Sequence, residues 1–283
     1  MTNLKNTDGT DIYFEDLGSG KPIVFIHGWP LSGAMWEYQV VPLVKAGFRC
    51  ISYDRRGFGR SGKSTLNYDY ATLGRDLAAL LETLDLKDVT LVGFSMGGGE
   101  VVEYLARHNT KGRVIRAMLV SSITPFMLKT ESNPDGVDGG VFKDMQAGLL
   151  ADRPAFLTDF TEKFFGVGLL SSPVSLPMIA ASCEVAMTAS ALATVECVTT
   201  FSATDFRAEC RAISVPVLII HGDGDATVPV DASGKRAAEL IPAAELKIYA
   251  GAPHGLFYTN RHELNRDIAA FVSDGRIALE DAA

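Results

Sequence analysis

The chain is predicted to be an α/β protein whose mostly parallel central sheet is flanked by helices. Short apolar runs without polar alternation, such as residues 23–26 and 217–220, indicate strands buried on both faces. Apolar residues at helical spacing follow several of these runs, most clearly in the leucine stripe from Leu73 to Leu84. Strands that alternate with helices favour parallel pairing through crossover connections.

The expected elements can be placed in order along the chain. A half-exposed strand is expected around Ile12 and Phe14, and a helix over residues 35–45. The leucine stripe and the segment that follows Gly99 are further helices, and residues 264–271 lie in the last one. Short apolar runs predict buried strands at residues 23–26, 48–53, 89–92, 117–121, 217–220 and 247–249.

One long interval breaks the alternation of strands and helices. It opens with a Gly/Pro/Asp-rich loop at residues 133–140 and continues with short helical patterns that carry several phenylalanines. We expect residues 1–122 and 212–283 to form the core, and residues 123–211 to form a small helical cap inserted after the sixth strand. Most of the aromatic side chains in this interval are expected to pack within the cap itself.

Length and composition restrict the class of protein. A chain of 283 residues with 47% hydrophobic content can bury one large core. Its formal charge of −8 and pI near 5.2, without a cluster of basic residues, argue against a nucleic-acid partner. The polar N-terminus lacks the apolar stretch of a signal peptide, and no run approaches the length of a membrane span. We therefore expect a cytoplasmic protein with no membrane partner.

A predicted strand-to-helix turn carries the most informative motif of the chain. Its pattern is Gly-x-Ser-x-Gly, with Ser95 between Gly93 and Gly97. A turn this tight is expected to strain the backbone of Ser95 and to lift its hydroxyl above the sheet. Ser95 is the predicted nucleophile, although an ordinary glycine-rich turn or a phosphate cradle uses the same residue types. A phosphate loop would need Gly-Lys-Ser/Thr, where this sequence has Gly-Gly-Glu.

Two further residues complete a candidate catalytic triad. Ligands of parallel sheets bind beyond the carboxyl ends of the strands, and Asp225 and His254 each follow an expected strand. The chain order Ser95, Asp225, His254 is that of α/β-hydrolase triads. In such a triad the imidazole takes the serine proton, and the carboxylate orients the imidazole. Asp223 lies in the same loop as Asp225, but Asp225 is preferred because it lies deeper in that loop.

The other histidines and the cysteines are predicted to have structural roles or to be solvated, and none is predicted to be catalytic. His108 and His262 are expected to be solvated, His221 to be packed and hydrogen-bonded, and His27 to brace neighbouring loops. They lack the spacing of a ligand pair, so no metal site is predicted. Neither metal-ligand spacing nor a dense disulfide pattern is found among the cysteines, which are interpreted as reduced thiols. These are Cys50, Cys183, Cys197 and Cys210.

An oxyanion hole is expected from two backbone N–H groups. One belongs to Met96, directly after Ser95, and the other to Trp29, in the loop after an early strand. Pro30 has no N–H and favours extended geometry at Trp29, which would fix how the peptide groups of Trp29 face the substrate. A proline that only stiffens the turn is the alternative.

Five segments together resemble the cofactor-free (non-haem) haloperoxidases and their aryl-esterase relatives. The similarity extends over most of the chain. It implies an α/β-hydrolase that cleaves small carboxylic esters through an acyl-Ser95 intermediate and needs neither haem nor metal. It also implies perhydrolase activity, in which hydrogen peroxide attacks the acyl group and the resulting peracid oxidises halide. The five segments are His27-Gly28-Trp29-Pro30, residues 54–61, residues 93–99, residues 221–225 and Ala252-Pro253-His254-Gly255.

The resemblance also implies a small acyl pocket and a set of partners. The proline at position 30 resembles the residue found there in the haloperoxidase branch of the family. The expected partners are a small ester or carboxylic acid and hydrogen peroxide, and homo-oligomerisation is left open. A lactonase, a carbon–carbon bond hydrolase and a ligand-sensing protein without activity are the alternatives on this fold. The residues implied to line the pocket, besides Trp29, are Pro30, Phe94, Phe126, Phe142, Phe160, Phe164 and Val228.

Overall fold

The computed structural model describes residues 3–6, 8–168, 171–275 and 279. Its described strands form one sheet in the order β1-β2-β4-β3-β5-β6-β7-β8. The strand β2 pairs antiparallel with β1 and with β4, whereas the remaining pairs are parallel, so the predicted sheet is confirmed. The strands are β1 (Asn3–Lys5), β2 (Asp11–Gly18), β3 (Pro22–Ile26), β4 (Arg49–Tyr53), β5 (Val89–Phe94), β6 (Val114–Val120), β7 (Val217–Gly222) and β8 (Ala244–Tyr249).

Burial explains which strands could be predicted from the sequence. Every residue of β5 and β7 is buried, in keeping with their continuous apolar runs. The first strand, β1, lies at the edge and consists of Asn3, Leu4 and Lys5, of which none is fully buried. It was not predicted because three residues at a solvated edge leave no hydrophobic pattern.

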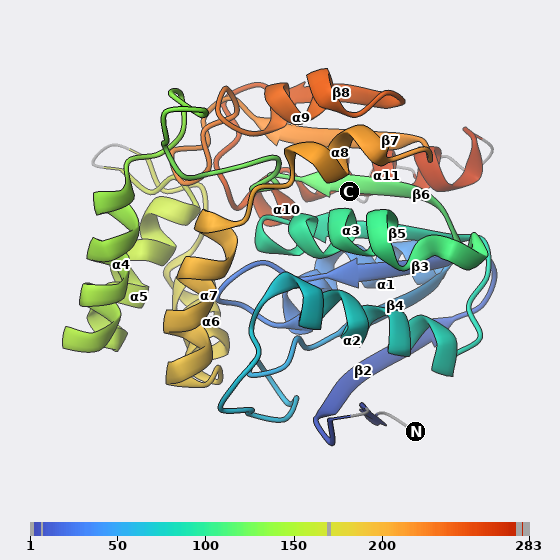
Figure 1. Ribbon diagram of the computed structural model, residues 1–283, viewed down its shortest axis with the longest axis horizontal. Helices are drawn as coiled ribbons and strands as arrows, with labels where there is room; N and C mark the ends of the chain where they lie inside the picture. Colours follow the sequence, from blue (N-terminus) through green and yellow to red (C-terminus); the bar gives the residue numbers. More distant parts are fainter. Residues whose placement is uncertain (1–2, 7, 169–170, 276–278, 280–283) are drawn as a thin grey trace.

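Helices cover both faces of the sheet (Figure 1). The helices α2, α3 and α8 pack together on one face, and α1, α10 and α11 on the other. In α2, the predicted stripe is buried from Leu73 to Leu81. The helix expected at residues 35–45 begins as a 3-10 turn, Gly33–Trp36. The helices named here are α1 (Glu37–Lys45), α2 (Tyr70–Thr83), α3 (Met96–Arg107), α8 (Arg207–Ala212), α10 (Leu256–Thr259) and α11 (Arg261–Ser273).

Four helices between β6 and β7 lie beside the end of the sheet where the parallel strands finish (Figure 1). Among them, α4 packs against α5 and α7, and α5 packs against α6. Side-chain oxygens of Asp138, Asp152, Ser175 and Ser190 cap their N-termini. The four helices are α4 (Gly139–Ala151), α5 (Arg153–Phe164), α6 (Leu176–Met187) and α7 (Ala191–Ala203), and α9 (Gly234–Leu240) follows β7.

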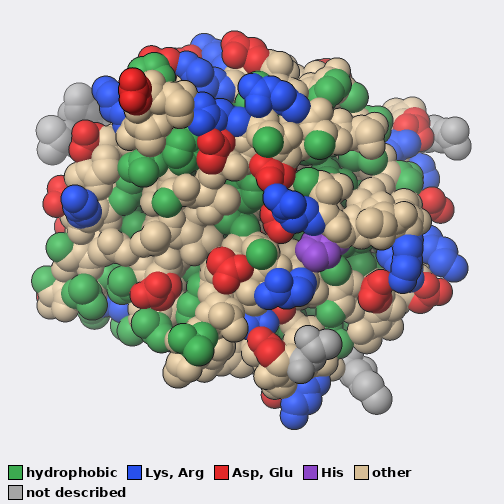
Figure 2. Space-filling view, in the orientation of Figure 1, with side chains coloured by type: hydrophobic (Ala, Val, Ile, Leu, Met, Phe, Trp, Pro, Cys, Tyr) green, Lys and Arg blue, Asp and Glu red, His purple; other side chains and the backbone are tan. Residues whose placement is uncertain are grey.

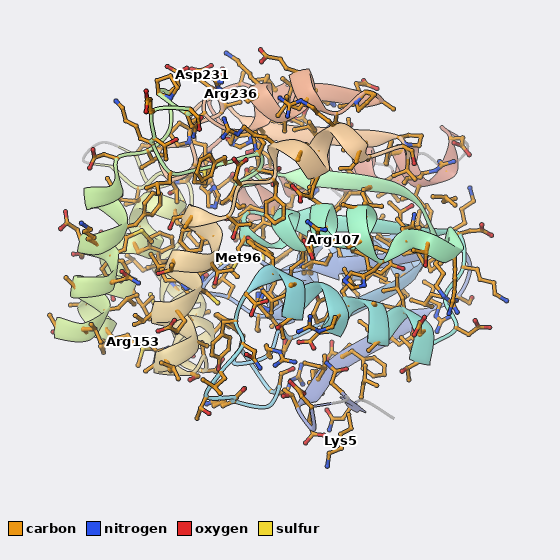
Figure 3. All side chains as sticks on the ribbon, viewed as in Figure 1. Lys5, Met96, Arg107, Arg153, Asp231 and Arg236 are labelled. Carbon is orange, nitrogen blue, oxygen red and sulfur yellow. The ribbon has the colours of Figure 1, made fainter. Side chains whose placement is uncertain are left out.

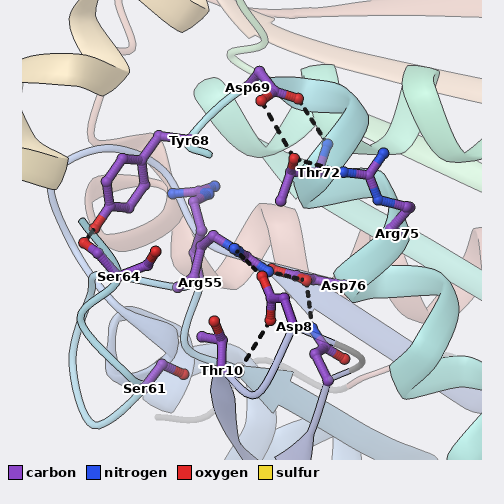
Figure 4. A network of polar contacts seen from close by, with 12 residues as sticks. Asp8, Thr10, Arg55, Ser61, Ser64, Tyr68, Asp69, Thr72, Arg75 and Asp76 are labelled. Carbon is purple, nitrogen blue, oxygen red and sulfur yellow. Dashed lines mark hydrogen bonds and ion pairs between the residues drawn. The ribbon is translucent and has the colours of Figure 1, made fainter. Parts of the chain in front are cut away.

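A buried ion pair ties the N-terminal segment to α2. Arg56 binds the carboxylate of Asp76 through Nε at 2.6 Å and reaches Asp8 through Nη1 at 2.8 Å. The amide of Asn6 also donates to Asp76. Figure 4 shows Asp8 beside Asp76 in this network, and Asp69 at the start of α2 accepting from Thr72. The contacts hold the antiparallel edge of the sheet against the helical layer.

The visible surface mixes charges of both signs (Figure 2), and the cysteines are free thiols. On the face in Figure 2, acidic and basic side chains are interspersed, and hydrophobic groups gather over the four helices α4–α7. All four cysteines are free thiols, and burial raises the pKa of Cys197 to about 12. In the described part of the chain no single helix could span a membrane, although α6 and α7, bent by 96°, together have the length and composition of a span.

Candidate active site

The turn at Ser95 has the strained geometry that the motif predicts. Ser95 adopts φ 52° and ψ −119° between β5 and α3, a conformation that costs on the order of 1–3 kcal/mol and persists only in a rigid surround. A Cβ on Gly97 would lie 2.5 Å from the carbonyl oxygen of Ile26, and one on Gly93 would lie 2.6 Å from that of Gly97. Glycine is therefore required on both sides of the serine.

The structure brings Ser95, His254 and Asp225 together from the ends of three strands. The Ser95 hydroxyl oxygen lies 3.0 Å from Nε2 of His254, and Nδ1 of His254 lies 2.6 Å from Oδ2 of Asp225. All three side chains are buried. This is the relay in which an imidazole can take the serine proton while a carboxylate stabilises the imidazolium.

Asp225 is held in its charged form by several donors. Burial alone would raise its pKa, but the charges and hydrogen bonds of His254 and His221 outweigh burial and lower it well below the usual range. The other carboxylate oxygen, Oδ1, accepts from the backbone N–H groups of Thr227 and Val228 at 2.9 and 2.8 Å. In contrast, Asp223 is exposed and accepts from the N–H of Gly251, away from the imidazole. The choice of Asp225 over Asp223 agrees with this geometry.

Two backbone donors are available beside Ser95. Met96 begins α3, and Figure 3 shows it between that helix and the helices α4–α7. Within the described chain, the N–H groups of Met96 and Trp29 donate to no other group. The peptide bond between Trp29 and Pro30 is cis. Free N–H groups at a helix N-terminus and in the facing loop are suited to stabilise a developing oxyanion.

His27 braces the loop that carries Trp29. Burial, reinforced by the charge of Arg55, lowers the pKa of His27 well below its usual value, so its imidazole is neutral. Nδ1 donates to the carbonyl of Gly28 at 2.8 Å, and Nε2 accepts from the N–H of Arg55 at 2.9 Å. These bonds fix the residue that precedes Trp29.

A fully buried charge network lies beneath this loop. Arg55 donates to the carbonyl of His27 at 2.7 Å and forms an ion pair with Glu100 of α3. Tyr53 donates to the second carboxylate oxygen of Glu100 at 2.5 Å. The network therefore connects the loop before Trp29 with the helix that begins at Met96. Sequence reasoning gave Arg55 no role, because Arg55 and Glu100 are far apart in the chain.

A cavity of about 50 Å³ opens onto the Ser95 hydroxyl. Trp29 closes one side, with its ring 5.1 Å from that of Phe160 and its indole N–H bound to the carbonyl of Thr194 at 2.9 Å. Apart from the reactive groups and one threonine, the lining is apolar. It consists of Trp29, Ser95, Ile123, Met127, Val137, Val141, Phe142, Met145, Phe160, Phe201, Thr227, Val228 and His254.

Four of the predicted lining residues, Trp29, Phe142, Phe160 and Val228, do line this cavity. Phe94 and Phe164 were also expected there, but each ring centre lies 4.9 Å from that of His254, so they pack against the imidazole and outside the lining. Phe94 is the last residue of β5 and has no exposed surface. Phe94 therefore supports the imidazole of His254 by packing against it.

Two other predicted lining residues also lie elsewhere. Pro30 lines, with Phe164, a separate space of only about 10 Å³ that shares Phe160 with the cavity. Phe126 packs under the guanidinium of Arg207, 5.3 Å from its ring centre. A larger groove of about 310 Å³ between the start of α1 and α6 contains no triad residue, so the small cavity is the relevant one.

Sequence reasoning missed much of the lining on α4. Val141, Phe142 and Met145 share one face of that helix, and the spacing was a usable signal. Among the described residues, no group of three or more His, Cys, Asp or Glu side chains could hold a metal ion. The polar groups that converge on the cavity are those of an acyl-transfer site.

Comparisons with known proteins agree with this geometry. A family model described as the alpha/beta hydrolase fold matches residues 21–261. A non-heme chloroperoxidase from Kitasatospora aureofaciens is 43% identical over 94% of this chain and 97% of its own. A bifunctional esterase/perhydrolase from Acinetobacter calcoaceticus is 40% identical over 96% and 99%.

A solved structure also matches the fold over nearly the whole chain. A bromoperoxidase from Bacillus anthracis superposes with a TM-score of 0.92 at 44% identity, covering 96% of this chain and 100% of its own. Family model, relatives and structure all match nearly the whole core, including the three strands that carry the triad. The chain therefore belongs to the α/β-hydrolase family, in the group that contains the non-heme haloperoxidases and their esterase/perhydrolase relatives.

Proposed function

We propose that the protein is a serine esterase for small carboxylic esters with perhydrolase activity. The observation that carries the proposal is the relay from Ser95 through His254 to Asp225, at 3.0 and 2.6 Å, beside a small apolar cavity. The names of the relatives, which include an esterase/perhydrolase and haloperoxidases, support the same activity. Intact reactive groups favour an enzyme over a ligand sensor.

The first half-reaction acylates Ser95. Nε2 of His254 takes the hydroxyl proton as the serine oxygen attacks the ester carbonyl. The N–H groups of Met96 and Trp29 receive the oxyanion, where each donor is typically worth about 2.7–4 kcal/mol. His254 then returns the proton to the departing alcohol, and the carbonyl re-forms as acyl-Ser95.

The second half-reaction transfers the acyl group to water or to hydrogen peroxide. With water, His254 removes one proton and the products are the carboxylic acid and free Ser95. With hydrogen peroxide, one of its two equivalent oxygens attacks while His254 takes the proton and passes it to the departing Ser95 oxygen, so the products are the peracid and free Ser95. The peracid then oxidises halide in solution: its terminal oxygen is transferred to bromide with uptake of a proton, which gives hypobromous acid and regenerates the carboxylic acid.

The cavity favours short acyl groups. A space of about 50 Å³ between Trp29, Phe160 and Phe201 is of the size expected for a short acyl group such as acetyl or propionyl. Longer chains would have to displace aromatic rings packed at 5.1 and 5.7 Å from the Trp29 ring. We therefore place the preferred substrates among acetates and propionates of aryl or small alkyl alcohols.

Replacing the nucleophile tests the proposal. Ser95→Ala should lower kcat for p-nitrophenyl acetate by at least about 10⁴-fold, because the covalent route is lost. The unfolding midpoint should stay close to that of the wild type or rise slightly, since alanine fits the same turn. Activity retained in a purified, folded Ser95→Ala protein would overturn the assignment.

Halide oxidation tests the second activity. Bromination of a β-diketone by peroxide and bromide should require an added ester or carboxylic acid and should disappear in Ser95→Ala. Bromination that continues after every ester and carboxylic acid has been removed would contradict the peracid route.

A further inference from the structure

A second buried imidazole contacts the triad carboxylate. His221 lies near the end of β7, and its side chain is fully buried. Nε2 lies 2.9 Å from the carbonyl oxygen of Val228 and 3.3 Å from Oδ2 of Asp225. Oδ2 is the same oxygen that binds His254.

The surroundings of His221 fix its tautomer. A carbonyl oxygen can only accept a hydrogen bond, so the contact with Val228 places a proton on Nε2. Nδ1 is buried and has no hydrogen-bond partner within the described chain. It faces Gly234 at the start of α9, where a Cβ would lie only 2.8 Å away. The Nε2–H group of His221 therefore donates to the carbonyl of Val228 and lies beside Oδ2 of Asp225.

Polar groups surround both oxygens of Asp225. Oδ1 accepts two backbone N–H groups, and Oδ2 accepts from the imidazole of His254 and lies 3.3 Å from Nε2 of His221. A carboxylate with each oxygen held in this way cannot rotate about its Cβ–Cγ bond without losing several bonds. Its position relative to His254 then depends partly on His221.

The same N–H also reaches the wall of the cavity. Val228 lines the space beside Ser95, and its carbonyl is the nearer acceptor of His221. Its backbone N–H is bound to Asp225, so the backbone of Val228 is held at both its N–H and its carbonyl. One buried N–H thus connects the catalytic carboxylate with a side chain that borders the acyl group.

We propose that His221 is a positioning residue that sets the orientation of Asp225 and the place of Val228 through its Nε2–H. It touches neither substrate nor the reacting atoms. The inference rests on the esterase activity proposed above. Loss of this donor should lower kcat and also weaken the discrimination between short and longer acyl groups, whereas loss of packing alone would lower stability.

Two substitutions separate the effect of the hydrogen-bond donor of His221 from the effect of its side-chain volume. In His221→Gln, the side-chain amide nitrogen reaches about as far as Nε2 and can donate to the same oxygens. His221→Met fills a similar volume without a donor. The exposed His262 on α11 provides the control, His262→Met, which removes a histidine from the surface. Steady-state kinetics with p-nitrophenyl acetate and butyrate, and thermal unfolding, are measured for each protein.

The Met variant should lose about tenfold to a hundredfold in kcat for the acetate, the size of a hydrogen bond to a charged group, with KM little changed. Its ratio of acetate to butyrate activity should also fall. The Gln variant should stay within about threefold of the wild type, and His262→Met should match the wild type. Should the Met variant not fold, His221→Asn, whose amide lies where Nδ1 was, is measured in its place with the same expectation.

Equal kcat in the wild type and in His221→Met would overturn the role of His221. The same conclusion would follow if kcat of His221→Gln fell as far as kcat of His221→Met. Failure of the proposed function would look different. In that case the wild type itself would not turn over these esters, and Ser95→Ala would have nothing to abolish.

Discussion

The end of the sheet and the helices above it shape the same cavity in different ways. On the sheet side, Ser95, Asp225 and His254 each follow a parallel strand of the sheet, namely β5, β7 and β8, and backbone geometry places them. On the helical side, Phe142, Phe160 and Phe201 come from α4, α5 and α7, and only packing between these helices places them. We infer that the sheet side determines the reaction and the helical side determines which acyl group enters.

The largest effect is expected on the sheet side. Asp225→Asn should lower kcat by about 10⁴-fold, because the amide favours the wrong tautomer of His254. The neighbouring Asp223→Asn is the matched control, since the side chain of Asp223 is exposed and accepts from the N–H of Gly251, away from the imidazole. It should stay within about threefold of the wild type. Equal losses in the two variants would show that the loop, and not the carboxylate at the imidazole, matters.

A second substitution sharpens the comparison within the sheet side. Arg55→Met leaves Glu100 buried without its cation and should cost about 3–5 kcal/mol in the free energy of unfolding. The double variant with Glu100→Met removes both charges and should recover much of that stability. Activity should stay low in both, because the carbonyl of His27 has lost its donor. Chemical denaturation and kcat for an aryl acetate measure the two effects separately, and full recovery of kcat in the double variant would contradict this role for Arg55.

The smallest effect on the reaction is expected on the helical side. Phe160→Ala enlarges the cavity next to Trp29 and should raise kcat/KM for butyrate relative to acetate by about tenfold, the size typical of one or two methylene groups. Phe156→Ala is the control, since Phe156 stacks on Phe160 but does not line the cavity. An unchanged acyl preference in Phe160→Ala would argue that another wall sets the limit.

The same division explains what the sequence predicted. Ser95, Asp225 and His254 could be found because each follows a recognisable strand, and the rule on strand ends joins them without knowledge of the packing. The pairing of Arg55 with Glu100 depends on contacts between segments 45 residues apart, for which a single sequence has no signal. Phe94 was misplaced because the motif shows that it lies next to Ser95 but does not show where its ring points. It faces Trp36 and Phe257, whose packing only the fold reveals.

The helical side was predicted least well for a similar reason. Phe142 and Phe160 were found with the help of the family resemblance, whereas Met127, Met145 and Phe201 were not. Met145 and Phe201 lie on helices that are apolar on more than one face, and Met127 lies in the loop between β6 and α4. Which face meets Trp29 depends on how α4, α5 and α7 pack on one another.

One measurement tests the central claim that water and peroxide compete for a single acyl-Ser95. Acetyl esters with different leaving groups, such as p-nitrophenyl, phenyl and ethyl acetate, are turned over at one fixed concentration of hydrogen peroxide, and peracetic and acetic acid are quantified. A common intermediate predicts the same ratio of the two acids from all three esters, although their rates differ. A ratio that changes with the leaving group would contradict it.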